Sequence, residues 1–157
     1  MDFSKLKKSE QIIAIGAIVG IVSAFLPWYS WSYNVWGVSS SGGVNGMTEW
    51  WMFSFIAAFL AGLMVVLPLF GVKLPELGVE NKVIYMILGG VAGGIPVLAL
   101  ISGASTSAGV AGVGSAGPSF GLFGAIAGGA VILFGAFMDK GKGGAKPSEP
   151  TAPKEGE

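Results

Sequence analysis

Long uncharged stretches constrain this chain more than any other feature of its sequence. Charged residues are confined to 2–10, Glu49, 73–82 and 139–157. An α-helix rises about 1.5 Å per residue, so roughly 20 apolar residues cross the ~30 Å hydrocarbon core of a bilayer. Four stretches have about that length and no internal charge, namely 11–29, 51–72, 83–103 and 120–138. The sequence therefore predicts an all-α membrane protein whose fold is a four-helix transmembrane bundle.

The composition supports one membrane domain followed by a polar tail. Only 11% of the residues are charged and 52% are hydrophobic, whereas soluble domains carry about 25% charged residues. We therefore expect residues 1–139 to form the four-span transmembrane domain. Residues 140–157 are Lys, Gly, Pro, Glu, Ala, Ser and Thr, a composition typical of disorder. We expect them to form a disordered cytoplasmic tail.

The lysines predict the direction of the four spans. All nine cationic residues are lysines: three precede the first span, two lie between the second and third, and four follow the fourth. The connections after the first and third spans contain none. Because cytoplasmic loops of membrane proteins are enriched in Lys and Arg, both termini are expected in the cytoplasm of a multi-pass protein.

A cleaved signal peptide is the alternative reading of the N-terminus. Lysines precede an apolar run, and Val22-Ser23-Ala24 offers small residues at which a peptidase could cut. Cleavage there would leave a mature chain starting at Phe25 and would remove the first span. Because Phe25 and Leu26 continue the apolar run, we favour a retained first span.

The outer loop at 30–50 is predicted to contain a short β-hairpin. From Tyr29 to Val35, aromatic or apolar residues alternate with Ser and Asn, the period-two pattern of a half-buried strand. The turn-rich stretch 39–43 is expected to reverse the chain, and 44–48 to return as a second strand. This hairpin is predicted to lie over the outer ends of the helices. The second outer loop, which is rich in small residues, is expected to be mobile.

Aromatic residues in the same loop form the candidate partner-binding surface. All five tryptophans lie between 28 and 51. Trp28, Trp50 and Trp51 sit at span ends, where an aromatic belt at the lipid headgroups explains them. Residues within the loop are less well explained by a belt, and aromatic side chains are typical interface anchors. We therefore take Trp31, Tyr33 and Trp36 as candidates for binding a partner.

Glycines in the fourth span form the candidate helix-packing stripe. Gly121, Gly128 and Gly135 repeat every seven residues, and Gly124 lies nearby. Small residues let helices approach closely in lipid, so the stripe is expected to pack within the bundle or against a second copy in a homo-oligomer. In the third span, Pro96 is expected to kink the helix and to free a backbone carbonyl near Ala92.

The missing residue types exclude several functions. The chain has no Cys, His or Arg, so no thiol chemistry, Cys/His metal set or cofactor site is predicted, and we expect no enzymatic activity. A net charge of zero argues against nucleic-acid binding. No Asp, Glu, His, Lys or Arg lies within a span, which weakens a transporter reading. The leading hypothesis is a scaffold or accessory subunit whose partners are the lipid bilayer and a membrane protein. An oligomeric channel or small-molecule transporter is the alternative.

The chain resembles small prokaryotic four-span membrane proteins of no established activity. The resemblance rests on Phe25-Leu26-Pro27-Trp28, the Ser/Tyr/Trp-rich outer loop, Asn45-Gly46 and the aromatic entry to the second span. It implies a location in the plasma membrane. The layout is also distantly similar to that of claudin-type tetraspan proteins, whose first outer loop bears strands. The Gly-Leu-Trp run and the loop cysteine pair of that family are missing here, so its paracellular function is not carried over.

Overall fold

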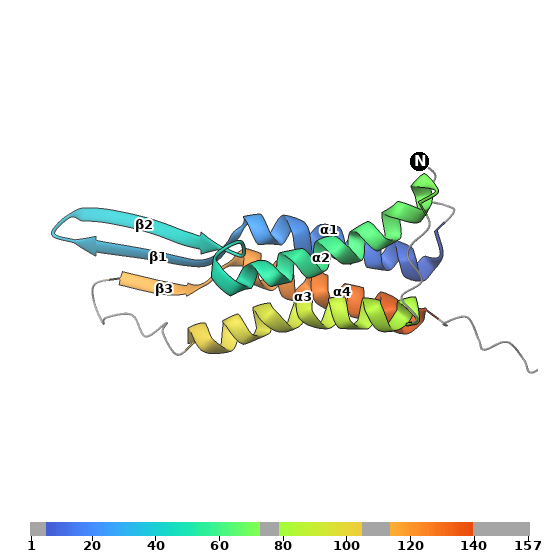
Figure 1. The fold of residues 1–157 in the computed structure, drawn as a ribbon. Helices are drawn as coiled ribbons and strands as arrows, with labels where there is room; N and C mark the ends of the chain where they lie inside the picture. The colour runs from blue at the N-terminus through green and yellow to red at the C-terminus, as the bar shows by residue number, and fades with distance from the viewer. Residues whose placement is uncertain (1–5, 73–78, 105–113, 140–157) are drawn as a thin grey trace, which may run out of the picture.

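The structure is a computed structural model that describes residues 6–72, 79–104 and 114–139. It contains four long helices and a three-stranded antiparallel sheet (Figure 1). The helices are α1 (Lys8–Phe25), α2 (Met52–Val66), α3 (Asn81–Ala104) and α4 (Phe120–Met138), and the strands are β1 (Pro27–Val35), β2 (Val38–Asn45) and β3 (Gly114–Pro118). The predicted tail at 140–157 and most of the second outer loop lie outside the described residues.

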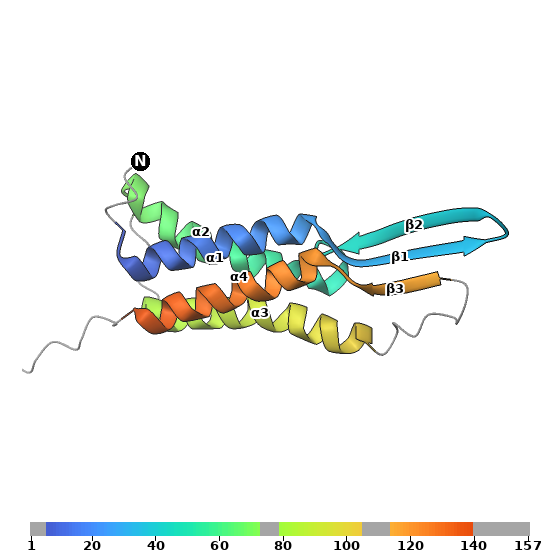
Figure 2. The ribbon, with the colours of Figure 1, turned by 180° about the vertical axis from the view of Figure 1, so that it is seen from behind.

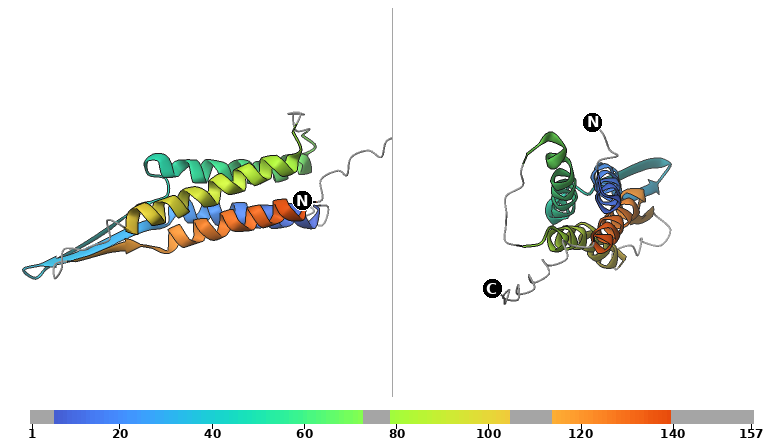
Figure 3. Two further views of the ribbon diagram at one scale, coloured as in Figure 1. Left: turned by 90° about the horizontal axis from the view of Figure 1, so that it is seen from below. Right: turned by 90° about the vertical axis from the view of Figure 1, so that its right-hand side faces the viewer.

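The four helices run side by side as a bundle (Figures 1 and 3). Each is long and apolar enough to cross a membrane, with 3-10 turns η2 (Glu49–Trp51) and η3 (Leu67–Phe70) extending α2 at its two ends. The four-helix part of the predicted fold is confirmed. The helix α1 packs on α2 and α4, and α3 packs on the same two helices. The core is built mainly from alanines and glycines with a few larger side chains such as Ile13 and Ile132, both fully buried.

The first helix ends earlier than the sequence predicted. It stops at Phe25, and Pro27–Val35 is strand β1, so 27–29 belong to the sheet and not to the span. Pro27 explains the difference, because a proline disfavours helical backbone in the residue before it. Leu26 accordingly adopts extended angles, with φ −80° and ψ 156°.

The hairpin prediction is confirmed, but the position of its turn was wrong. The chain reverses at Trp36 and Gly37, and the stretch 39–43 lies inside β2. The serines and glycines of that stretch resemble turn residues by composition, yet the cross-strand register continues from Val35↔Val38 to Pro27↔Asn45 with one irregularity between Pro27 and Tyr29.

The hairpin also belongs to a larger sheet that the sequence did not reveal. Strand β3, from the second outer segment, pairs with β1 and gives the order β2-β1-β3. The expectation of a mobile loop is therefore wrong for Gly114–Pro118, and the fold is not purely α-helical. The sheet continues the long axis of the bundle beyond the ends of the helices and does not fold back over them (Figures 1 and 2).

Candidate functional site

The sheet is joined to the bundle by an aromatic junction made of Trp28, Tyr29 and Trp51. Trp28 is fully buried, and its indole Nε1 donates a hydrogen bond to the Ser23 carbonyl oxygen at 3.0 Å. Its ring stacks on that of Trp51, with centroids 5.6 Å apart and an interplanar angle of 21°. A buried indole N–H normally needs such a partner, and the last turn of α1 supplies it. The predicted belt residue Trp28 is therefore part of the protein core.

The hydroxyl of Tyr29 ties the same junction to α3. It donates a hydrogen bond to the Ala99 carbonyl oxygen at 2.5 Å. Burial raises the pKa of Tyr29, which favours the protonated hydroxyl further. Backbone bonds add to this anchor: Gly46 N–H donates to the Ala24 carbonyl, and Ser119 N–H donates to the Trp28 carbonyl. The base of the sheet is therefore held by helices on several sides.

The two faces of the sheet differ in chemistry. Because side chains alternate along a strand, Trp31, Tyr33 and Val35 of β1 lie on one face, which we call the aromatic face. The cross-strand partners from β2 join this face, and they are Gly42, Ser40 and Val38. The indole of Trp31 lies across Gly42, where an added Cβ would come within 2.5 Å of the ring.

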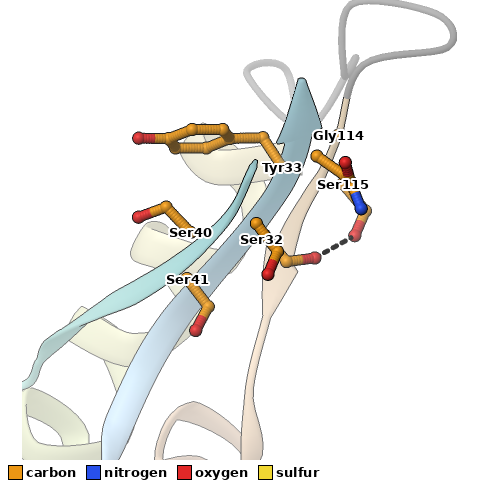
Figure 4. Close-up of a pocket in the computed structure, with 8 residues that line it drawn as sticks. Ser32, Tyr33, Ser40, Ser41, Gly114 and Ser115 are labelled. Atoms are coloured by element: carbon orange, nitrogen blue, oxygen red, sulfur yellow. Dashed lines mark hydrogen bonds between the residues drawn. The ribbon is translucent and has the colours of Figure 1, made fainter. Parts of the chain in front are cut away.

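The opposite face, which we call the serine face, is lined by short polar side chains. It carries Ser30, Ser32 and Asn34 of β1, with their partners Gly43, Ser41 and Ser39 of β2. On β3, Ser115 belongs to the same face, and its hydroxyl lies 3.1 Å from that of Ser32 (Figure 4). Two shallow hollows of about 640 and 560 Å³ follow the sheet here, and none of the described residues that line them is charged. The described residues of this surface offer hydroxyl, amide and backbone groups for hydrogen bonds.

The tip of the hairpin exposes a tryptophan in an unfavourable conformation. Trp36 is 98% exposed and has a φ of +56°, and Gly37 follows with a φ of +80°. Two successive positive φ values in a two-residue loop are those of a type I′ turn, which favours Asn-Gly. A left-handed conformation costs a residue with a Cβ about 1–2 kcal/mol. Val35 and Val38 flank the turn and are also exposed.

The three candidate partner-binding residues occupy two places. Trp31 and Tyr33 lie together on the aromatic face, 39% and 44% exposed, while Trp36 stands apart at the tip. Sequence alternation was sufficient to place the first two on one face. The position of Trp36 was missed because the turn was predicted further along the chain.

The glycine stripe of α4 lies against α1 and the two residues that follow it. A Cβ on Gly121 would meet the backbone oxygens of Leu26 and Pro27, and one on Gly135 would meet Ile13 and the Ser9 oxygen. Between them, Gly124 faces Ser23, and Gly128 faces the backbone of Gly16 and Gly20. The structure therefore uses all four candidate packing residues inside one chain.

The described part of the chain contains no candidate metal cluster. No group of three or more His, Cys, Asp or Glu residues within 6–72, 79–104 and 114–139 is placed to hold a metal ion. Comparison of the chain with protein-family models and with curated proteins finds no match. The uncharged sheet, with its exposed aromatic residues, is therefore the feature on which a function can be argued.

Proposed function

We propose that this chain is a multi-pass protein of the plasma membrane, with both termini in the cytoplasm, that acts as a non-enzymatic scaffold or accessory subunit. In this proposal the helices hold the protein in the bilayer and the sheet presents a binding surface outside the cell. Four apolar helices and the lysine distribution support the membrane location and the orientation.

The observation that carries the proposal is the combination of a firmly anchored sheet with aromatic residues left in solvent. The junction of Trp28, Tyr29 and Trp51 fixes the base of the sheet, so the exposed rings are held in a defined position. Binding then costs little conformational entropy, because the surface is preorganised. Tryptophan and tyrosine are also enriched among residues that dominate binding energy.

Membrane orientation can be tested with a reporter fused after Glu157. A reporter that is active only in the cytoplasm should be active, and a periplasm- or exterior-specific reporter at the same position should be silent. The opposite pattern would overturn the proposed orientation. A chain that purifies in buffer without amphiphile would overturn the membrane location itself.

The scaffold role can be tested by measuring the mass of the complex isolated in mild detergent. Trp31→Ala and Trp36→Ala should each reduce the mass of the complex while the helices remain folded. Trp50→Ala is the matched control, because Trp50 is 42% exposed but lies in η2 beside the helices. An unchanged mass with both sheet variants would contradict the proposal. Solute flux into proteoliposomes above that of empty vesicles would favour the channel or transporter alternative instead.

A further inference from the structure

The free edge of β2 lacks the protection that exposed edges usually carry. β2 has eight residues, and among the residues that the structure describes it pairs on one side only, with β1. Soluble and secreted proteins protect such edges with charged side chains, prolines or bulges, because unpaired backbone groups recruit other strands. β2 contains no charged residue and no proline. Its register with β1 is regular from Val38 to Val44.

The turn determines which backbone groups of β2 point outward. In a hairpin with a two-residue loop, the residues that flank the loop form a hydrogen-bonded pair, here Val35 and Val38. Hydrogen-bonded and non-hydrogen-bonded pairs then alternate along the ladder. Ser39, Ser41 and Gly43 therefore direct their N–H and C=O groups away from β1 and toward the free edge.

We propose that this edge pairs antiparallel with β2 of a second copy of the chain, about a two-fold axis at Ser41. The inference rests on the proposed function, because it takes the sheet to be the binding surface of a membrane protein. In this register Ser41 meets Ser41, Ser39 meets Gly43, and the outward groups of all three residues find partners. It forms about six intermolecular main-chain hydrogen bonds.

The same register is complementary in its side chains. On the serine face it sets Ser39 beside Gly43. On the aromatic face it sets Val38 beside Val44 at the closely spaced, non-hydrogen-bonded positions where side chains contact best. Because the edge is uncharged, no like charges meet across the two-fold axis. An identical strand is thus a suitable partner for this edge.

Pairing with a second copy also provides a place for the exposed Trp36. The register brings Trp36 of one copy level with Gly46 at the base of the other sheet. Beside that position is a hollow of about 380 Å³ lined by Phe25, Pro27, Gly43, Val44, Asn45 and Thr48. Phe25 is itself 60% exposed. In the symmetric pair, the Trp36 indole of each copy would then cover the partly apolar hollow at the base of the other copy.

The direction of the sheet determines how the two copies are oriented. The hairpin continues the axis of the bundle (Figure 2), and antiparallel pairing requires a two-fold axis perpendicular to the strands. The two bundles therefore lie at opposite ends of the joined sheet. In membranes this arrangement links two facing bilayers. The eight residues of β2 separate them by about 27 Å, because a strand rises 3.3–3.4 Å per residue.

A charge-exchange experiment at Ser41 tests the pairing, with the full chain in vesicles and light scattering at low salt as the readout of vesicle association. Ser41→Lys and Ser41→Glu should each lower the association rate at least about tenfold, because like charges meet on the two-fold axis. Mixing vesicles that carry Ser41→Lys with vesicles that carry Ser41→Glu should restore association. This recovery also shows that both variants are folded.

Ser115→Lys is the matched control for the charge-exchange experiment. Ser115 lies on the same face but on β3, and it is also exposed, so this variant should associate like the wild type. Loss of association with Ser115→Lys equal to that with Ser41→Lys would overturn the proposal, as would failure of the mixed vesicles to associate. Association of protein-bearing vesicles with empty ones would mean that the sheet binds lipid, and it would also overturn the pairing with a second copy.

Cysteine cross-linking tests the register directly, since the natural chain has no cysteine. Ser41→Cys should form a disulfide-linked dimer on mild oxidation, because a hydrogen-bonded pair places the two Cα atoms about 5.5 Å apart. Ser39→Cys should cross-link efficiently to Gly43→Cys and poorly to itself. Equal yields from Ser41→Cys and Ser115→Cys would overturn the register. Variants that float with vesicles but neither associate nor cross-link would refute this inference and leave the proposed membrane location standing.

Discussion

The hydroxyl of Ser54 on α2 donates a hydrogen bond to the carbonyl oxygen of Ala92 on α3, at 2.7 Å. Ala92 is four residues before Pro96, which has no N–H and so cannot form the helical bond to this carbonyl. Both Ser54 and Ala92 are buried. A backbone defect in one helix is therefore corrected by a side chain from its neighbour, as is common where a proline interrupts a membrane helix.

Replacing Ser54 with Ala should leave the Ala92 carbonyl without this partner. We expect Ser54→Ala to lower the free energy of unfolding in detergent by about 1 kcal/mol, the usual size of an interhelical hydrogen bond in a membrane protein. Thermal or denaturant unfolding of the purified chain measures the loss. A variant as stable as the wild type would show that the bond contributes nothing net.

A double-mutant cycle attributes the loss to the missing helical bond. Pro96→Ala restores an N–H that can bond to the Ala92 carbonyl, so Ser54→Ala should cost less in that background than in the wild type. The difference between the two costs is the coupling energy between the positions. Equal costs in both backgrounds would contradict this account.

The Ser54–Ala92 pair shows what the sequence could and could not predict about packing. Pro96 was sufficient to predict a freed carbonyl near Ala92, because that consequence is local to one helix. The donor could not be predicted, since Ser54 is distant in sequence and nothing local distinguishes it from other serines. The glycine stripe of α4 was likewise visible as a pattern, while its partner α1 became evident only in the assembled bundle.

The sheet was predicted only where its pattern is local. Alternation of aromatic and polar residues marked β1, but β2 and β3 consist largely of Ser, Gly and Ala. Of the β-branched residues typical of strands, β2 has only Val38 and Val44, and β3 has none. Gly114–Pro118 becomes a strand because β1 offers it an edge for pairing, and not through its own propensity. The paired position of Ser32 and Ser115 could therefore not be inferred from the sequence.

Packing at the aromatic junction should make Gly46 sensitive to substitution. A Cβ at this position would collide with the buried Trp28 indole, so Gly46→Ala should cost about 1–3 kcal/mol of stability through overpacking. Gly117→Ala is the matched control, because its Cβ would meet no described atom within 4 Å. Thermal unfolding of both variants checks the expectation. Similar midpoints for the two variants would mean that the junction can yield to the added methyl group.

Trp36 should be a residue whose replacement stabilises the hairpin. Asn tolerates a positive φ much better than Trp, and the exposed indole makes few contacts that could be lost. Trp36→Asn should therefore slow hydrogen exchange of the β1–β2 amides, with a gain of up to about 1 kcal/mol, while it weakens vesicle association. Faster exchange would show that the indole stabilises the isolated chain. Unchanged association would show that Trp36 does not contribute to pairing.

Gly128 and Gly90 offer a matched test of the contact between α1 and α4. A Cβ on Gly128 would lie 2.7 Å from the backbone nitrogen of Gly20, whereas one on Gly90 would meet no atom of the described residues within 4 Å. Backbone cannot move aside as a flexible side chain can, so Gly128→Leu must force the two helices apart. We expect it to cost several kcal/mol, at or above the 1–3 kcal/mol typical of overpacked cores. Gly90→Leu should change stability little, since its side chain would extend away from the bundle.

Thermal unfolding in detergent, with oligomer size measured by light scattering, compares the two variants. If Gly90→Leu lowered stability more than Gly128→Leu, the outer surface of α3 would be the glycine-rich face that stabilises the protein. Close approach of α1 and α4 would then not be what holds the bundle together.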